Sequence, residues 1–327
     1  TVTGTATTWD PGANNSVLSL KVDGTTLYVG GFFSTIAGAA RNRIAALDAG
    51  TGVATAFNPN ANEPAHVFVV SGSTVYMGGG FTTLGGQPRS YIAAVDATTG
   101  APTSWNPGAS SFVNGLVVDG TTVYAGGDFT TIGGATRTRL AALDTTTGTA
   151  TSWNPGADSQ VNTLSMNGTT IYAGGLFSMV GGQARNRLAA LDAATGQVTS
   201  WNPNANGYVQ GMAVVGSTVY VGGGFTNVGG QTRGRFAAID ATTGAVTGSD
   251  LNANNDIIAM TASATTVYAG GHFTSMGGQT RNRIAAIDAA TGALTSWNAN
   301  ADAFVSALTM SGTTVYAGGD FGSIGGQ

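Results

Sequence analysis

Residues 161–203 read VNTLSMNGTTIYAGGLFSMVGGQARNRLAALDAATGQVTSWNP. Four short runs of β-branched and apolar residues lie in this stretch, at 161–167, 170–174, 187–192 and 197–201. Asn-Gly, diglycine and Thr-Gly pairs separate the runs and predict turns, and none of the runs has a helical period. The stretch therefore predicts four short β-strands, with a long loop through Gly181-Gly182 between the second and the third.

The same pattern recurs every 48 residues along the chain. A diglycine and then a phenylalanine follow the tyrosine of each copy. The equivalent tyrosines are Tyr28, Tyr76, Tyr124, Tyr172, Tyr220, Tyr268 and Tyr316. Four strands per copy and seven copies predict an all-β, seven-bladed β-propeller whose four-stranded blades each take one 48-residue repeat.

The aromatic residue that ends the fourth run varies between copies. It is tryptophan at Trp9, Trp105, Trp153, Trp201 and Trp297, and Phe57 and Ser249 stand in its place elsewhere. Adjacent blades are expected to bury these rings, each contributing roughly 2–3 kcal/mol. The blade that carries Ser249 is therefore expected to be the most loosely packed.

The ends of the chain do not complete the pattern. The chain has 327 residues, nine fewer than the 336 of seven full repeats. The third run of the last copy is missing after Gln327, whereas residues 1–9 align with 289–297. We predict one propeller domain over residues 1–327, with an N-terminal strand 1–9 that closes a last blade lacking one strand. The chain is then a segment of a longer protein, or another chain supplies the strand through self-association.

One string recurs in most copies: Gly-Gly-x-Phe-Thr-x-x-Gly-Gly-Gln-x-Arg-Asn-Arg-Leu/Ile-Ala-Ala-Leu-Asp, followed by Thr-Gly and Trp-Asn-Pro. It resembles the delta-60-type propeller repeat of bacterial surface proteins, and its first diglycine is kelch-like. The resemblance covers the whole chain and implies a secreted or surface-attached propeller. More weakly, residues 190–201 are similar to the repeats of quinoprotein propellers. Their enzymatic activity is not implied, because their calcium ligands and vicinal disulfide cannot be located here.

Composition restricts the partners. Charged residues make up 9% of the chain, the net charge is −4 and Lys21 is the only lysine, so nucleic acid is not expected as a partner. Cysteine is absent, which excludes disulfides, thiolate metal sites and a cysteine nucleophile. No apolar run reaches the roughly 18 residues of a membrane span. The lysine-poor surface, rich in Thr, Gly and Asn, indicates an extracellular or cell-surface location.

One group of positions varies from copy to copy just before the first strand, where a propeller has its central funnel. Aromatic, amide and carboxylate side chains alternate there, a combination that suits ring stacking and hydrogen bonding to a sugar. The candidate ligand-binding residues are Asn15, Glu63, Phe112, Gln160, Tyr208, Asp256 and Phe304. The alternative is that these aromatic residues only plug the channel or pack between blades.

All eleven arginines lie at one place in the repeat, where the third run begins. Their spacing of two predicts that paired side chains leave one face of the third strand. As an anion-binding rim we name Arg41, Arg89, Arg137, Arg185, Arg233 and Arg281. The alternative is structural: each arginine stacks on an aromatic ring or bonds to loop carbonyl groups.

A third repeated group is predicted to stabilise turns. The aspartates that end the third runs each precede a Thr-Gly pair, so their side chains are expected to accept backbone N–H bonds. They are Asp48, Asp96, Asp144, Asp192, Asp240 and Asp288.

Catalysis is not indicated by the sequence. Glu63 is the only glutamate, there is no G-x-S-x-G motif, and His66 and His272 have no metal-ligand spacing. We predict no metal and no cofactor. The leading interpretation is a non-enzymatic binding or scaffold propeller that presents a rigid disk to a glycan or a protein. The alternatives are a carbohydrate-active enzyme and a structural subunit of a fibre or surface array.

Overall fold

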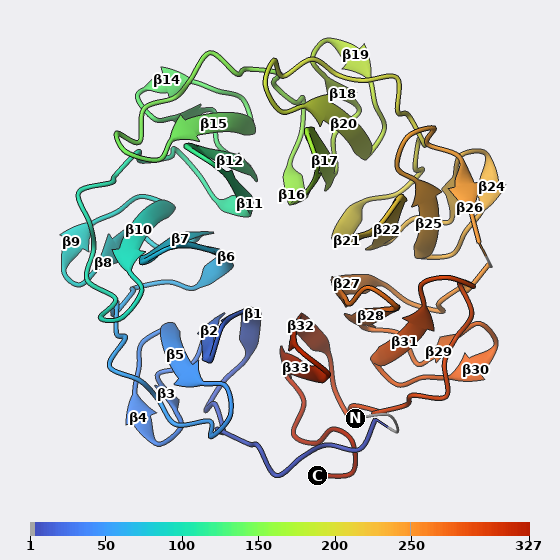
Figure 1. Cartoon of the computed structure of the whole chain (residues 1–327), viewed down its shortest axis with the longest axis horizontal. Helices are drawn as coiled ribbons and strands as arrows, with labels where there is room; N and C mark the ends of the chain where they lie inside the picture. Colours follow the sequence, from blue (N-terminus) through green and yellow to red (C-terminus); the bar gives the residue numbers. More distant parts are fainter. Residues whose placement is uncertain (1–3, 249) are drawn as a thin grey trace. The chain divides into compact units, whose positions relative to one another are not determined.

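The computed structural model describes residues 4–248 and 250–327, and within them it contains strands and turns but no helix. The strands form small antiparallel sheets of two to four strands, as in propeller-type folds (Figure 1). The chain divides into two compact units. The first unit is Trp9–Val161, and the second is Asn162–Gln327 with the described part of Thr1–Thr8.

In the first unit each large sheet has three strands, and the second strand in sequence lies in the middle. The sheets are β1 (Val17–Asp23), β2 (Thr26–Gly31) and β5 (Ile44–Asp48); β6 (Ala65–Ser71), β7 (Thr74–Gly79) and β10 (Ile92–Asp96); and β11 (Val113–Asp119), β12 (Thr122–Gly127) and β15 (Leu140–Asp144). The connection before each third strand was expected to be a plain loop, but it forms a small hairpin. These hairpins are β3 (Thr35–Ile36) with β4 (Ala39–Ala40), β8 (Thr83–Leu84) with β9 (Gln87–Pro88), and β13 (Thr131–Ile132) with β14 (Ala135–Thr136).

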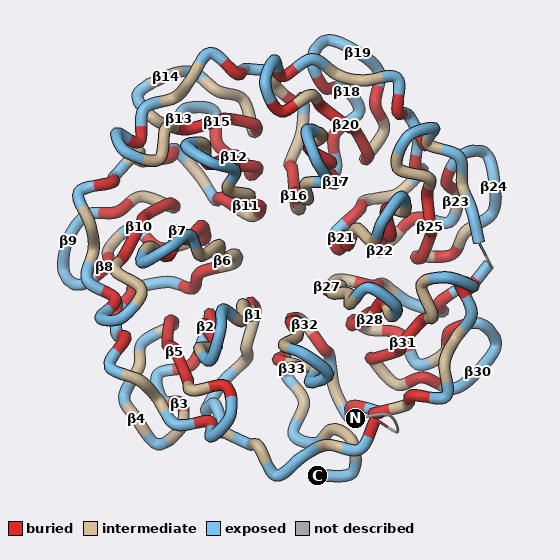
Figure 2. Tube along the Cα trace, in the orientation of Figure 1, coloured by how far each residue is buried: buried red, intermediate tan, exposed pale blue. Residues whose placement is uncertain are grey.

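The second unit repeats this arrangement. Its large sheets are β16 (Val161–Asn167), β17 (Thr170–Gly175) and β20 (Leu188–Asp192); β21 (Val209–Val215), β22 (Thr218–Gly223), β25 (Phe236–Asp240) and β26 (Val246–Thr247); β27 (Ile257–Ala262), β28 (Thr266–Gly271) and β31 (Ile284–Asp288); and β32 (Val305–Ser311) with β33 (Thr314–Gly319). Its hairpins are β18 (Met179–Val180) with β19 (Gln183–Ala184), β23 (Asn227–Val228) with β24 (Gln231–Thr232), and β29 (Ser275–Met276) with β30 (Gln279–Thr280). Figure 2 shows that the exposed residues gather on such hairpins and that the buried ones follow the strands of the large sheets.

In the described residues, the fourth run of the repeat forms less strand than predicted. Among residues 4–248 and 250–327, β26 is the only fourth segment that forms a strand; in the sheet of β20, for example, the corresponding segment makes the single bridge Leu191↔Val198. The cause is local. The Thr199 N–H group donates to the Ala190 carbonyl, and the Thr199 hydroxyl then accepts the N–H group of Trp201 at 3.2 Å. When a threonine hydroxyl accepts the N–H group of the residue two positions further on, that N–H group is not available to the sheet, and the strand ends there.

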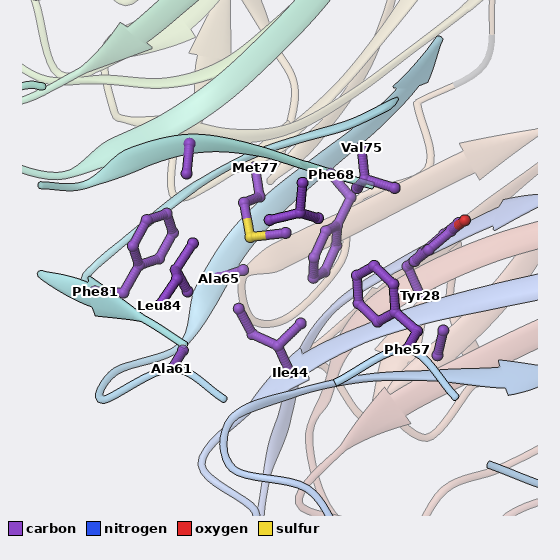
Figure 3. Packing of buried hydrophobic residues seen from close by; sticks show 13 residues of the cluster. Tyr28, Ile44, Phe57, Ala61, Ala65, Phe68, Val75, Met77, Phe81 and Leu84 are labelled. Carbon is purple, nitrogen blue, oxygen red and sulfur yellow. The ribbon is translucent and has the colours of Figure 1, made fainter. Parts of the chain in front are cut away.

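Neighbouring sheets within a unit share apolar cores. In the first unit, Tyr28 and Phe57 pack edge to face with their ring centroids 5.2 Å apart. Both lie in one cluster with Phe68 and Met77 of the next sheet, as Figure 3 shows. Phe57 and Met77 are completely buried. The aromatic residues of the repeat therefore hold one sheet to the next, as their spacing predicts.

The tyrosine and tryptophan of a repeat also donate hydrogen bonds to the turn of the next sheet. Trp105 donates from Nε1 to the Asp144 carbonyl at 2.9 Å, and its ring packs edge to face on Tyr76 at 5.0 Å. In the second unit Trp201 donates in the same way to the Asp240 carbonyl at 2.9 Å. These bonds satisfy the polar ends of buried rings, which removes the cost of burying them. The Ser249 position, where a loose blade was expected, lies outside the described residues.

Candidate functional site

The diglycine of each repeat fixes where the variable residue before the first strand lies. A Cβ atom on Gly127 would collide with the carbonyl oxygen of Phe112, and one on Gly223 would collide with that of Tyr208. The N–H group of Asp128, directly after the diglycine, donates to that Phe112 carbonyl at 2.9 Å. Only glycine allows this close approach of two backbone segments. The repeat therefore provides a fixed backbone frame on which the variable side chains are displayed.

In the first unit, Phe112 is the centre of an aromatic cluster. Its side chain is 43% exposed, although it is a large apolar group. The His66 ring stacks on it with a centroid distance of 5.9 Å, and the Tyr91 ring meets it edge-on at 5.6 Å. We call His66, Tyr91 and Phe112 the Phe112 cluster. Its exposed ring face is held in place by two neighbouring aromatic rings.

Polar groups border the Phe112 cluster. His66 Nδ1 lies 3.1 Å from Asn114 Oδ1, which fixes the plane of the imidazole ring. A Cβ atom on Gly80 would lie 3.1 Å from the Phe112 ring and 3.6 Å from Glu63 Cβ, so Glu63 stands beside the cluster. Glu63 is exposed. The cluster thus combines an exposed aromatic ring with an imidazole, and the exposed residue Glu63 is its neighbour.

Two predicted site residues of the first unit stay apart from this cluster. Asn15 is exposed and its side-chain oxygen accepts the N–H group of Ser16 at 2.8 Å, which makes it a turn residue. Gln160 is half-buried near the end of the unit. Within residues 9–161 as described, neither residue forms a hydrogen bond or ring contact with Phe112, His66 or Tyr91.

In the second unit, the structure joins three of the predicted residues. The Tyr208 hydroxyl donates to the Asp256 carboxylate, and Arg235 Nε lies 3.8 Å from the other Asp256 oxygen. The carbonyl group of Asp256 accepts the His272 N–H group at 2.9 Å, and the His272 ring lies 4.1 Å from that of Phe304. We call Tyr208, Arg235, Asp256, His272 and Phe304 the Tyr208 cluster.

The electrostatics of the Tyr208 cluster follow from these contacts. Burial, and then the hydrogen bond to the Asp256 carboxylate, raise the pKa of Tyr208 to about 12, so the hydroxyl stays a donor at neutral pH. Gly224 makes room for the Tyr208 ring, since a Cβ atom there would collide with it. Phe304 is 41% exposed, so this cluster also presents an aromatic face.

Sequence reasoning did not assign the two histidines to these sites. The chain contains two histidines. The structure places each of them against an exposed phenylalanine, Phe112 or Phe304, at the variable position just before the first strand of a repeat. His272 occupies a position that varies between repeats, directly after the diglycine, and this variation was the available signal. His66 lies inside β6, where a histidine is indistinguishable in sequence from an ordinary strand residue.

The predicted rim arginines point largely into the protein. Arg89 donates to the Thr103 carbonyl at 2.7 Å and Arg185 to the Thr199 carbonyl at 2.6 Å. Arg89 and Arg185 are buried, as is Arg281, which donates to the Thr295 carbonyl at 2.9 Å. These bonds favour the structural alternative, in which the arginines bond to loop carbonyl groups. Anion binding by this group stays a prediction.

The remaining rim arginines are less buried. Arg41 and Arg137 donate to the Thr55 and Thr151 carbonyls at 2.7 and 2.5 Å. Arg233 donates to the Thr232 carbonyl at 2.9 Å and to Gln231 Oε1 at 3.0 Å.

The expectation that paired arginines share one face of the third strand is wrong. β20 begins at Leu188, after both arginines, and Arg187 has a φ of 66°. The equivalent Arg43, Arg139, Arg235 and Arg283 have φ values of 64° or 65°. A left-handed residue breaks the alternation of a strand, so the two side chains of a pair point to different places. Sequence spacing gave no sign of this conformation, because arginine rarely adopts it.

The predicted role of the repeated aspartates is confirmed. Asp48 Oδ1 accepts the N–H and hydroxyl groups of Thr51 at 2.7 and 2.8 Å, and Asp144 accepts those of Thr147 at 2.7 and 3.0 Å. These hydrogen bonds lower the pKa of both carboxyl groups below the ordinary value of 3.8. The aspartates therefore stabilise the turns that follow the third strands.

Across residues 4–248 and 250–327, no three His, Asp or Glu side chains gather as a metal site would require. None of the described segments is a helix that is long and apolar enough to cross a membrane.

Comparison with known proteins supports a propeller-type fold. A family model described as outer membrane protein assembly factor BamB, a quinoprotein-type propeller repeat, matches residues 127–249. The crystal structure of the computationally designed Ika8 protein is similar with a TM-score of 0.59 and 16% sequence identity over 96% of each chain. The comparison with curated proteins finds no match. The chain is thus a propeller-type repeat protein; the family match agrees with the quinoprotein resemblance, whereas the delta-60-type resemblance stays a prediction.

Proposed function

We propose that the chain is a seven-bladed β-propeller of an extracellular or cell-surface protein that binds a neutral glycan without catalysis. One observation carries the proposal: two exposed phenylalanines, Phe112 and Phe304, are each held against a histidine ring and bordered by polar groups. The propeller is supported by the recurring sheets, the seven copies of the repeat and the similarity to Ika8. The lysine-poor composition supports the location.

The chemistry of the Phe112 cluster suits a sugar. A pyranose ring presents a face of C–H groups that stacks on an aromatic ring, and its hydroxyl groups seek hydrogen bonds at the rim. Phe112 supplies the stacking face, and Glu63 and His66 supply an acceptor and a group that can donate or accept. The ring is already fixed by Tyr91 and His66, so little side-chain freedom is lost on binding.

Charge favours a neutral ligand. The net charge of the chain is −4, and Glu63 and Asp256 stand at the two clusters. Arginines that would attract an anionic sugar donate to backbone carbonyls instead, as Arg89 and Arg185 do. An anionic polysaccharide would therefore meet the exposed Glu63 at the Phe112 cluster, whereas the Asp256 carboxylate of the Tyr208 cluster is paired with Arg235.

The test is a screen of neutral and anionic polysaccharides with the whole chain at low and high salt. We expect binding of a neutral glycan that survives high salt, because stacking is not screened by ions. Phe112→Ala is expected to weaken it at least about tenfold, as truncation of a central aromatic contact does. The matched control is Met179→Ala, which removes an apolar side chain of similar exposure, 45%, from the hairpin strand β18.

Three outcomes would overturn the proposal. One is the absence of binding to every glycan in the screen. The second is binding that neither Phe112→Ala nor Phe304→Ala weakens. The third is binding to anionic glycans alone that is lost in high salt, which would point to the arginines.

A further inference from the structure

The chain contains three Asn-Gly pairs, Asn114-Gly115, Asn167-Gly168 and Asn206-Gly207. Such a pair can react with itself, because glycine has no side chain to shield its backbone nitrogen from the preceding asparagine amide. The glycine nitrogen attacks the side-chain carbonyl carbon, the amide nitrogen leaves as ammonia, and a succinimide ring forms. Water then opens the ring at either carbonyl group, which gives aspartate or isoaspartate. The fold decides which of the three pairs is free to react.

The side chain of Asn206 is exposed but fixed by hydrogen bonds. Its oxygen accepts the N–H groups of Thr226 and Asn227 at 2.8 and 2.9 Å, and its Nδ2 donates to Thr226 Oγ1 at 2.9 Å. A Cβ atom on Gly207 would lie 2.7 Å from Phe225 Cα, so the backbone of the glycine is closely packed as well. The carbonyl carbon cannot turn toward the Gly207 nitrogen unless these hydrogen bonds break, so the pair is protected.

Asn114-Gly115 is protected in a different way, because both residues lie inside β11. Gly115 is buried and pairs with Gly126 of β12. Asn114 is half-buried, and its Oδ1 lies 3.1 Å from His66 Nδ1. A strand inside a sheet keeps its extended backbone, so the Gly115 nitrogen cannot approach the side chain unless β11 opens.

Asn167-Gly168 has neither kind of protection. Asn167 is the last residue of β16, and Gly168 and Thr169 form the turn that leads to β17. All three residues are exposed, and a Cβ atom on Gly168 would meet nothing within 4 Å. Within residues 4–248 and 250–327, the Asn167 side chain makes one hydrogen bond, from Nδ2 to the Gly216 carbonyl at 2.9 Å. Water can replace this exposed bond, so the side chain can turn toward the Gly168 nitrogen.

The hydrogen bond of Asn167 connects two hairpins of the second unit. Gly216 lies in the turn between β21 and β22, so the Asn167 amide links the tip of one hairpin to the tip of another. A carboxylate only accepts hydrogen bonds, and neither aspartate nor isoaspartate can donate to the Gly216 carbonyl. Isoaspartate also adds an atom to the main chain beside a two-residue turn, whose length sets the register of the hairpin.

We propose that Asn167 is a site of spontaneous deamidation in the folded chain, and that its conversion breaks the link between the turn of β16 and β17 and Gly216. The equivalent residues Asp23 and Asp119 already carry a carboxylate at the same place in their hairpins, so the fold accepts an aspartate there. The reaction is independent of the proposed glycan function, because Asn167 belongs to neither the Phe112 cluster nor the Tyr208 cluster.

The test compares the folded chain with the denatured chain. Both are kept warm at mildly alkaline pH and are then cleaved after arginine, which places the three pairs in the separate peptides 90–137, 140–185 and 188–233. Mass spectrometry detects the exchange of an amide for an acid, and fragmentation assigns it to one asparagine. In the folded chain we expect Asn167 to convert at least about tenfold faster than Asn114 and Asn206, because only these two require local opening. In the denatured chain we expect similar rates at all three.

Two variants test the chemistry and its consequence. Asn167→Gln moves the carbonyl carbon one bond further from the backbone nitrogen, so the peptide 140–185 should stay unconverted at this position. Asn167→Asp carries the product from the start, and the N–H groups of Gly216 and Ser217 should then exchange with solvent faster than in the unmodified chain. Asn167→Ala, which removes the same donor without adding a charge, should accelerate this exchange as well.

Conversion of Asn114 or Asn206 as fast as that of Asn167 in the folded chain would overturn the proposal. So would a folded chain in which Asn167 stays intact while the denatured chain reacts. Unchanged hydrogen exchange at Gly216 and Ser217 in both Asn167→Asp and Asn167→Ala would show that the amide does not link the two hairpins, which would overturn the proposed consequence.

Discussion

The Phe112 cluster of the first unit and the Tyr208 cluster of the second unit stand on the same backbone frame but differ in their charged groups. In each frame a backbone carbonyl group packs against the second glycine of a diglycine. The carbonyl of Phe112 packs against Gly127, and that of Tyr208 packs against Gly223. On the first frame the neighbours of the phenylalanine are aromatic rings. On the second frame a tyrosine, a carboxylate and a guanidinium form a bonded network.

This difference separates what the repeat fixes from what the variable positions decide. The glycines, the turn aspartates and the buried aromatic residues are equivalent in both units, and they serve the fold. The side chains that differ decide which chemistry each frame offers. Substitutions of the shared frame should therefore affect both units alike, whereas substitutions of variable residues should act on one cluster.

The largest loss of stability is expected from substitutions of the glycines in the shared frame. Gly127→Ala and Gly223→Ala each place a methyl group against a backbone carbonyl group, so we expect each to lower the free energy of unfolding by about 3 kcal/mol. Urea denaturation measures the loss. Gly50→Ala is the control, because its added methyl group meets only Asp48 Oδ1 at 3.4 Å, and it should change stability by about 0.5 kcal/mol or less. Equal effects of all three substitutions would contradict the role of the diglycine.

A smaller effect should distinguish the two clusters. Tyr208→Phe removes the hydroxyl group that donates to Asp256, and we expect a loss of about 1 kcal/mol. The expected loss of unfolding free energy is small because the side chains of Arg235 and Asp256 are 31% and 24% exposed, so water can replace the hydroxyl donor. Tyr91→Phe in the Phe112 cluster keeps the ring contact with Phe112 and should cost less than 0.5 kcal/mol. If the two substitutions cost the same, the network of the Tyr208 cluster contributes nothing to stability.

The sequence predicted the frame well because the frame repeats. The spacing of Tyr28 and its equivalents indicated the recurring sheets, and the aspartates ahead of Thr-Gly behave as expected. The left-handed conformation of Arg187 and the short fourth segments were missed. Both depend on local hydrogen bonds, such as that between Thr199 and Trp201, that the residue pattern does not reveal.

The candidate sites could be predicted only in part. Variation between repeats pointed to Phe112, Tyr208, Asp256 and Phe304, and the structure joins Tyr208 to Asp256. The partner residues were missed because they belong to other strands or other sheets. Which side chains meet across neighbouring sheets depends on the direction of each rotamer, and no spacing along one strand contains that information.

Acid should weaken both units through the shared turns. The pKa of Asp48, Asp144 and their equivalents is lowered in the folded chain by bonds from threonine N–H and hydroxyl groups. A group with a lowered pKa stabilises the folded state above its unfolded pKa, and this contribution is lost as the pH falls through the folded value. We therefore expect the urea midpoint to be constant from neutral pH to about pH 5 and to fall below about pH 4.

The variant Asp144→Asn tests the source of this acid dependence. It removes one titrating group but keeps an oxygen that can accept from Thr147, so the variant should show a flatter decline below pH 4. Asp10→Asn is the control, since Asp10 is exposed and lies outside the repeated turns. An unchanged slope for Asp144→Asn would mean that other groups cause the acid sensitivity.

The smallest effect is expected where a histidine supports an exposed ring. His66→Ala removes the ring that stacks on Phe112 at 5.9 Å, and the phenylalanine then gains rotamer freedom that glycan binding must remove again. We expect the dissociation constant of the neutral glycan to rise about threefold, well below the loss for Phe112→Ala. His66→Phe keeps an aromatic ring in this place and should restore most of the affinity. If His66→Phe binds as weakly as His66→Ala, the imidazole acts through a hydrogen bond to the glycan and not by holding the ring, and the two clusters then differ less in chemistry than their contacts indicate.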